Sequence, residues 1–322
     1  MRPVITRRDF LERATCAGAL LAVGSHVGEA QGVTGQMYLS LNSSVTRGVG
    51  WPDLARLAAR VGFDGVDWSL GAARTAGLDA TKALFAELKI RPSITNLPMA
   101  RPLPFQAEQA AFDQALVQLA DEAAFTAAIG CDRMMLVLSP TGPLPKDEWR
   151  KVVRDRMAAI SQVLQRANIR IGLEFLGVQS FRAGREGGPP PNPFIWTLPE
   201  TVALAKDSGP NVGVILDVWH WHHSGGTTAD ILATPRERIV HVHVSDAKAL
   251  PAAEVRDNQR VMPGEGVIDL NGFFQSLKKI GYADGVSPEP LGRVPAEMSA
   301  EDGARLALDT TRAAMKKAGV LA

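Results

Sequence analysis

Five of the chain's six histidines lie within 24 residues, in two segments that each read as a buried strand running into a loop. They are His220, His222, His223, His241 and His243. Aspartates accompany them, with Asp217 in the first segment and Asp246 at the end of the second. Because histidine is the commonest metal ligand and a neighbouring carboxylate supplies the charge that a divalent ion needs, this clustering predicts a metal site.

Four apolar segments that we expect to be consecutive strands end in a residue able to bind a metal. These residues are Glu174, Asp217, His243 and Glu289. A buried carboxylate is costly unless a partner or a metal neutralises it, and no lysine or arginine lies at these strand ends. Three carboxylates and one imidazole favour one Mn²⁺ ion, with Mg²⁺, Co²⁺ or Zn²⁺ as alternatives. A lone acid at any one of these positions is as well explained as a helix cap.

Short apolar or β-branched runs alternate with segments of helical periodicity from residue 37 onward. We predict strands near residues 37–41, 65–68, 90–95, 133–138, 169–175, 212–218, 239–245 and 285–289. Helices are predicted near residues 52–61, 79–89, 108–129, 146–167, 198–208, 228–233, 270–280 and 300–318. Gly62, Gly130, Gly209 and Gly281 stand where four of these helices should end.

Strict alternation of strand and helix implies a parallel sheet, and eight such units predict a single (β/α)8 TIM barrel over residues 31–322. An open doubly wound sheet is the alternative, but no glycine-rich dinucleotide fingerprint follows the first strand. In a barrel the four strand-end candidates would share the catalytic mouth. The proline- and glycine-rich segment 184–193 follows the fifth strand, so we expect it to be a rim loop or lid.

Several motifs of the chain resemble the xylose-isomerase-like barrels, a family that includes sugar isomerases, ketose 3-epimerases, inosose dehydratases and endonuclease IV. They are Leu216-Asp217-x-x-His220, His241-x-His243-x-x-Asp246-Ala247, Pro263-Gly-Glu-Gly-x-Ile-Asp269 and Pro288-Glu289-Pro290. The resemblance implies that the four strand-end residues hold one divalent metal. It also implies that Glu174 and Glu289 form an acid/base pair on opposite faces of a keto-sugar and that His220 contacts this substrate.

The chain departs from the epimerase pattern in two places. Ser180 stands where those relatives often carry an acid, and Ala249 stands where they carry an arginine. Arg256 and Arg260 lie in the same long loop, and each is either a replacement for that arginine or merely solvated.

We count Arg260 among the substrate-binding candidates. The others are His220, Trp219, His222, Asp246 and Lys248. Core packing of Trp219, a solvated His222 and a capping role for Asp246 remain as alternatives.

A metal that chelates a carbonyl and its neighbouring hydroxyl acidifies the adjacent C–H bond and stabilises the enediolate. We therefore predict a divalent-metal-dependent isomerase or epimerase that acts on a keto-sugar or polyol through an enediolate. A lyase or dehydratase that eliminates from an oxidised keto-sugar or glycoside at the same site is an alternative. A non-catalytic sugar-binding barrel and an endonuclease IV-like nuclease are others.

The first 30 residues have the order of an export signal. Thr6-Arg7-Arg8-Asp9-Phe10-Leu11 precedes an apolar stretch from Ala14 to Val23 and a small-x-small site at Gly28-Glu29-Ala30. The paired arginines resemble the twin-arginine type, although Glu12 stands where such signals often carry lysine. We expect residues 1–30 to be an export signal and the protein to be periplasmic or exported. An amphipathic first helix is the alternative.

The composition excludes several classes of partner. Residues 1–30 hold four arginines and three acidic residues, so the net charge of +1 becomes zero without them. Near-zero charge argues against nucleic acid, and no later segment is apolar enough for a membrane helix. Without Cys16 one cysteine, Cys131, remains, so no intramolecular disulfide is expected. The predicted partner is a small carbohydrate, and homo-oligomerisation is left open.

Overall fold

Eight parallel strands close into a barrel in the computed structural model, which describes residues 35–99, 104–183, 191–295 and 297–321. The order around the barrel is β1-β10-β9-β8-β6-β4-β3-β2. Its strands are β1 (Tyr38–Leu41), β2 (Gly65–Asp67), β3 (Arg91–Asn96), β4 (Arg133–Leu138), β6 (Arg170–Phe175), β8 (Val212–Asp217), β9 (Ile239–Val244) and β10 (Gly285–Pro288). The prediction of a single (β/α)8 TIM barrel is confirmed, and the open sheet is wrong.

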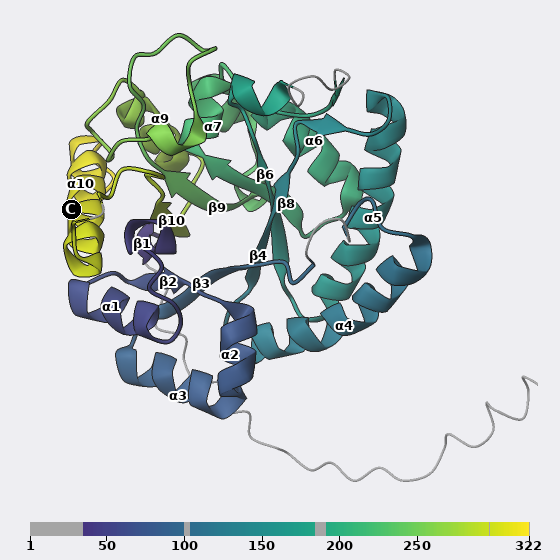
Figure 1. Cartoon of the computed structure of the whole chain (residues 1–322), viewed down its shortest axis with the longest axis horizontal. Coiled ribbons are helices and arrows are strands. Elements are labelled where there is room, and N and C mark those ends of the chain that lie inside the picture. Colours follow the sequence, from purple (N-terminus) through teal and green to yellow (C-terminus); the bar gives the residue numbers. More distant parts are fainter. Residues whose placement is uncertain (1–34, 100–103, 184–190, 296, 322) are drawn as a thin grey trace, which may run out of the picture. The chain divides into compact units, whose positions relative to one another are not determined.

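Helices surround these strands (Figure 1). They are α1 (Asp53–Val61), α2 (Leu70–Ala76), α3 (Leu78–Leu88), α4 (Gln109–Ala128), α5 (Lys146–Arg166), α6 (Leu198–Ser208), α7 (Val218–His223), α8 (Thr228–Ala233), α9 (Leu270–Lys279) and α10 (Ala300–Lys317). Short 3₁₀ turns lie at Ser43–Val45, Gln179–Arg182, Arg236–Arg238 and Asp257–Gln259. None of the helices in the described ranges is long and apolar enough to cross a membrane.

The predicted elements match the observed ones closely where apolar periodicity is strong. Gly62, for example, ends α1 at a φ of 99°, a left-handed conformation that favours glycine. Helix α2 and a small antiparallel pair, β5 (Thr141–Gly142) with β7 (Asn192–Pro193), were not predicted because they are too short to show a period. Residues 191–193 of the expected rim loop thus include a strand, whereas its residues 184–190 lie outside the described ranges.

The segment Val218–His223 forms helix α7, so the prediction of a loop there is wrong. The Asp217 side chain accepts a hydrogen bond of 2.9 Å from the Trp219 backbone N–H and thereby caps the helix. A helix of six residues is too short to show the repeat of apolar residues that identifies a helix. It also begins directly after a strand, so its capping residue, Asp217, is not recognisable as a helix cap in the sequence. The histidine-rich segment is therefore held more rigidly than a loop.

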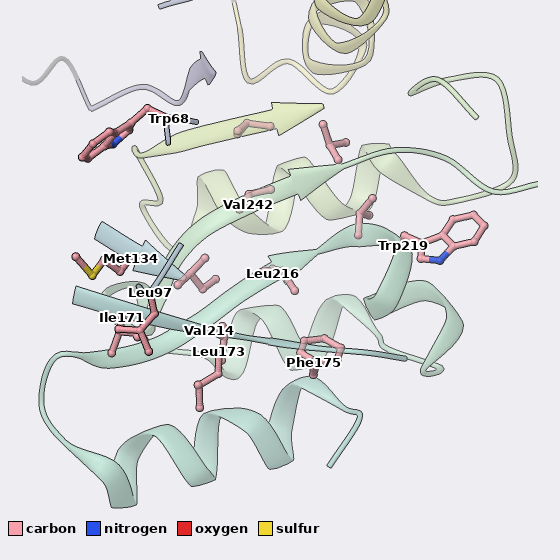
Figure 2. Close-up of a cluster of buried hydrophobic side chains, with 14 of the residues drawn as sticks. Trp68, Leu97, Met134, Ile171, Leu173, Phe175, Val214, Leu216, Trp219 and Val242 are labelled. Atoms are coloured by element: carbon pink, nitrogen blue, oxygen red, sulfur yellow. The ribbon is translucent and has the colours of Figure 1, made fainter. Parts of the chain in front are cut away.

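Successive side chains along each strand point alternately toward the barrel interior and toward the surrounding helices. In Figure 2, Leu173 and Phe175 of β6 and Leu216 of β8 belong to the large apolar cluster between sheet and helices. Their strand neighbours Glu174 and Asp217 consequently face the other way, toward the barrel axis. The packed outer layer fixes the direction of the polar residues that end the strands.

The predicted export signal, residues 1–30, lies outside the described residues. Residues 35–322 form one compact unit.

Candidate active site and metal centre

The four predicted metal ligands meet at one mouth of the barrel. Glu174 is in β6, Asp217 ends β8, His243 is in β9 and Glu289 follows β10 directly. One ligand atom from each lies within 4.8 Å of those of the other three. Glu174, Asp217 and His243 are buried, and Glu289 is half-buried. The strand register explains the convergence, because Asp217 pairs with His243 across β8 and β9.

The imidazole of His243 lies between two carboxylates. Its Nδ1 is 2.9 Å from Glu174 Oε1 and 3.4 Å from Glu289 Oε2. Four ligand atoms at about 2.0–2.2 Å from one ion would lie at most about 4.4 Å apart, so the observed cluster needs only a small contraction to hold a divalent ion. Buried oxygen donors together with one imidazole suit Mn²⁺, Mg²⁺ or Zn²⁺.

Arg260 supplies a positive charge that the strand ends lack. Its guanidinium Nη1 lies 2.8 Å from Asp217 Oδ2 and 3.1 Å from Glu289 Oε2, and its Nη2 lies 2.7 Å from Asp257 Oδ1. The side chain is 1% exposed, so the alternative of a solvated Arg260 is wrong. No lysine or arginine lies at the strand ends themselves, as predicted, but this loop residue brings a cation to two of the carboxylates. Arg256, in contrast, is exposed.

The charges of the cluster act strongly on one another. Burial raises the pKa of Asp217 and outweighs the opposing effect of Arg260. Burial also favours the neutral form of Glu289, but His243 and Arg260 together hold its pKa below the usual range. Burial disfavours the charged imidazole of His243, yet Glu289 and Glu174 hold its pKa well above the usual range. Without a metal, the protonated imidazole and the guanidinium neutralise the carboxylates.

His220 and Trp219 of α7 border this cluster. His220 Nε2 lies 3.7 Å from Asp217 Oδ2 and 3.4 Å from a guanidinium nitrogen of Arg260. Burial, together with the charge of Arg260, lowers the pKa of His220 well below its usual value, so this imidazole is neutral. The guanidinium carbon of Arg260 lies 5.4 Å from the centroid of the Trp219 ring. Both predicted residues are therefore beside the ligands, and Trp219 is buried against Arg260 rather than open to a sugar.

Three other predicted substrate contacts are placed differently. Both Asp246 carboxylate oxygens accept hydrogen bonds from backbone N–H groups. The donors are Ala247, Gly264, Gly266 and Ile268, at 2.8–3.0 Å. Asp246 thus clamps the Pro263-Gly-Glu-Gly turn and has no oxygen directed at a ligand. Lys248 is exposed and His222 half-buried, and no described contact ties either to the cluster.

A second polar network was not predicted. Asp67, which ends β2, accepts hydrogen bonds from Ser40 at 2.7 Å, Asn42 at 3.0 Å and Ser287 at 2.9 Å. Ser287 also bonds His241 Nε2 at 2.7 Å. The strand-end position of Asp67 was the one signal in the sequence, whereas its serine partners leave no pattern there.

A cavity of about 600 Å³ opens beside this network. Its walls come from β2, β3 and β4, from the segments that follow β1, β2 and β3, and from the beginnings of α1 and α2. The residues that contribute aromatic or amide side chains are Asn42, Trp51, Trp68 and Asn96. Sequence reasoning missed them because they are dispersed over three strand ends and share no spacing.

Comparisons with known proteins agree with this geometry. A family model described as xylose isomerase-like TIM barrel matches residues 55–313. Inosose isomerase of Bacillus velezensis is 28% identical over 172 residues, which cover 53% of this chain and 58% of that protein. The 3-dehydro-D-guloside 4-epimerase of Escherichia coli K12 is 26% identical over 162 residues, covering 50% of this chain and 53% of the relative. The chain thus aligns with little more than half the length of these curated relatives.

A solved structure has the same fold. The crystal structure of the IolI protein with a bound zinc atom superposes with a TM-score of 0.73 at 22% identity, and the match covers 87% of this chain and 99% of that one. At this identity the likeness establishes the fold, and the zinc belongs to that protein.

Proposed function

The chain belongs to the xylose isomerase-like TIM barrel family, and from that premise we propose that it is a metal-dependent isomerase or epimerase of a keto-sugar or polyol. The observation that carries this proposal is that Glu174 and Glu289, from different strand ends, both approach Nδ1 of His243. Two carboxylates that converge on one point from different strands are able to exchange a proton with one carbon from two directions.

The residues fit a divalent ion, which Glu174, Asp217, His243 and Glu289 would hold. Bound there, it would act as a Lewis acid toward the substrate carbonyl. Glu289 would accept the proton of a C–H bond beside the carbonyl, because its carboxylate lies in the ligand cluster that would hold the ion. Glu174, protonated at the start of the cycle, would give its proton to the same carbon from its own side, which inverts the carbon in an epimerisation. The proton taken by Glu289 would then be lost to solvent.

The remaining side chains would position the substrate. The neutral His220 presents a ring nitrogen at the edge of the cluster and is suited to hold a hydroxyl. Arg260 is held by Asp217, Glu289 and Asp257, so its charge is already used within the protein. No described residue that lines the neighbouring cavity is a lysine or an arginine. These features support a neutral carbohydrate over a phosphorylated one.

Solvent exchange tests the proposal. The protein saturated with Mn²⁺ should incorporate deuterium from D₂O into the carbon beside the carbonyl of a keto-sugar, and NMR measures this directly. Glu289→Gln should abolish exchange without changing the circular dichroism spectrum, whereas Glu254→Gln, an exposed change in the loop after β9, should leave exchange intact. Retained exchange in Glu289→Gln would remove this residue from the mechanism.

The same samples distinguish the alternative activities. Release of water or an alcohol with formation of an unsaturated product would identify elimination. Tight ligand retention without exchange would identify a sugar-binding barrel. Elemental analysis should find about one divalent ion per chain and its loss in His243→Ala, and no bound ion after Mn²⁺ loading would refute the metal centre.

We also propose that the protein is exported by its twin-arginine-type segment. Replacement of Arg7 and Arg8 by lysine should then shift the protein from the periplasmic to the cytoplasmic fraction, and an unchanged distribution would refute this route.

A further inference from the structure

The mouth of the barrel is divided into two halves. The four metal-ligand candidates belong to β6, β8, β9 and the end of β10, which are neighbours around the ring. The other four strands, β4, β3, β2 and β1, are also neighbours, and residues of β2, β3 and β4 together with the segment after β1 line the 600 Å³ cavity. One half of the mouth therefore carries the reactive groups, and the other half carries the open space.

The two halves meet at Asp67. Asp67 lines the cavity, and its carboxylate lies within 4.8 Å of a ring nitrogen of His243. Below this point Ile94, which also lines the cavity, packs in one buried cluster with Ile215, two residues before Asp217. The cavity therefore lies directly beside the ligand cluster, where it could receive part of a molecule that reacts there.

The cavity is larger than one sugar needs. Its volume equals that of about twenty water molecules in the liquid. A hexose has fewer non-hydrogen atoms than that, and bonded atoms occupy less room than separate water molecules. Pockets of this size usually accept ligands of drug-like dimensions.

The chemistry of the walls indicates what fills the space. Asp67 is the one charged side chain among the described lining residues, and it already accepts three hydrogen bonds. Trp51 and Trp68 supply aromatic surface, with ring centroids 6.4 Å apart. The exposed Asn96 adds an amide. Aromatic surface with a few neutral polar groups is suited to an uncharged ring.

We propose that this cavity, named here the ring subsite, binds an uncharged aglycone ring, so that the substrate is a keto-glycoside rather than a free keto-sugar. The inference rests on the proposed function, because it assumes that the keto-sugar reacts at the ligand cluster. The ring subsite then determines specificity and takes no part in the proton transfer.

Matched substrates and variants test the subsite. The methyl, phenyl and glucosyl glycosides of one keto-hexose differ only in the group that would enter it. The reaction followed is deuterium exchange by the Mn²⁺-loaded protein. We expect its kcat/KM with the phenyl or glucosyl compound to exceed that with the methyl compound about tenfold, equivalent to about 1.4 kcal/mol. Ser69→Trp fills the cavity from the loop after β2, and Asn96→Trp fills it from β3. Either change should abolish this preference.

Lys82→Trp is the control, because Lys82 is exposed on α3 and does not line the cavity. This variant should show the same ratio of kcat/KM between the phenyl or glucosyl and the methyl glycoside as the parent protein. Equal kcat/KM for all three glycosides in the parent, or an undiminished ratio in both folded cavity variants, would overturn the subsite.

Direct binding separates this proposal from the proposed function. If none of the glycosides exchanges deuterium, the proposed function fails, and calorimetry then decides on the cavity. A lower Kd for the phenyl or glucosyl compound than for the methyl compound, lost in Ser69→Trp, would support the subsite, and equal Kd values would overturn it.

Discussion

Replacement of Arg260 by glutamine should expose how the carboxylate cluster is neutralised. The guanidinium is 1% exposed and bonds three carboxylates, two of them proposed metal ligands. Glutamine keeps part of the side-chain volume and some hydrogen-bonding capacity but removes the charge. The structure therefore predicts a loss of stability that depends on whether a metal is present.

The magnitude follows from the burial of the ion pairs. Removal of one partner from a buried pair costs about 3–5 kcal/mol, because the other charge is left without compensation. For a protein of this size roughly 2 °C of Tm corresponds to 1 kcal/mol, so Arg260→Gln should lower Tm by about 6–10 °C in EDTA.

Metal should restore much of this loss. A ligand at a concentration 100 times its Kd stabilises the folded state by about 2.7 kcal/mol. Because the variant cluster is more negative, it should bind Mn²⁺ more tightly than the parent, and the metal-induced rise in Tm should be larger. Differential scanning calorimetry with and without Mn²⁺ gives both numbers for each protein.

Arg256→Gln is the matched control, since Arg256 lies four residues earlier in the same loop but is exposed. It should change Tm by less than about 1 °C in either condition. Two results would refute the reasoning: a Tm for Arg260→Gln within about 2 °C of the parent in EDTA, or equal metal-induced rises in the two proteins.

Three further outcomes follow from other buried groups. Asp246→Ala should lower the free energy of unfolding by about 3 kcal/mol or more, because the N–H groups of Gly264, Gly266 and Ile268 lose their acceptor. Hydrogen exchange of these three amides should accelerate, and unchanged exchange would contradict the role of Asp246 in holding the turn. Burial raises the pKa of the Cys131 thiol to about 11, so a thiol reagent at pH 8 should leave Cys131 unlabelled in the folded protein and label it in the unfolded chain, as peptide mapping would show; labelling of Cys131 in the folded protein would contradict this. Burial lowers the pKa of His223 to about 4, against about 6.5 when unfolded, so the unfolded state binds more protons between these values. Stability should thus fall as pH drops from 6.5 toward 4, and less steeply in His223→Gln; equal slopes would rule this cause out.

The barrel was predictable because its strands are buried on both faces and its helices are long. Strand β4 and helix α6 coincide with their predicted ranges. Helix α7 was missed because six residues carry no apolar period, and its cap, Asp217, looked like the last residue of a strand. Local spacing determines long elements, whereas the shortest ones depend on contacts that a linear pattern does not display.

The candidate site divides in the same way. Glu174, Asp217 and Glu289 were predictable because an acid in an apolar strand end is conspicuous. The role of Arg260 was not, since it lies 43 residues from Asp217, its partner, in a loop without periodicity. The ring subsite was equally hidden, because its walls combine ordinary residues such as Trp51 and Asn96 from separate loops and strands.

Arg260 and a divalent ion would both offset the negative charge of the carboxylates at the barrel mouth. The segment that follows Arg260 is fixed by the Asp246–Val261 backbone bridge and by the hydrogen bonds that Asp246 accepts from Gly264 and Gly266. Three carboxylate ligands need three positive charges, and an ion supplies two of them. Arg260 offsets part of the remaining negative charge without occupying a strand end, and it shares its charge with Asp257. The described walls of the ring subsite hold no lysine or arginine, so they offer no cation to an anionic group of a substrate.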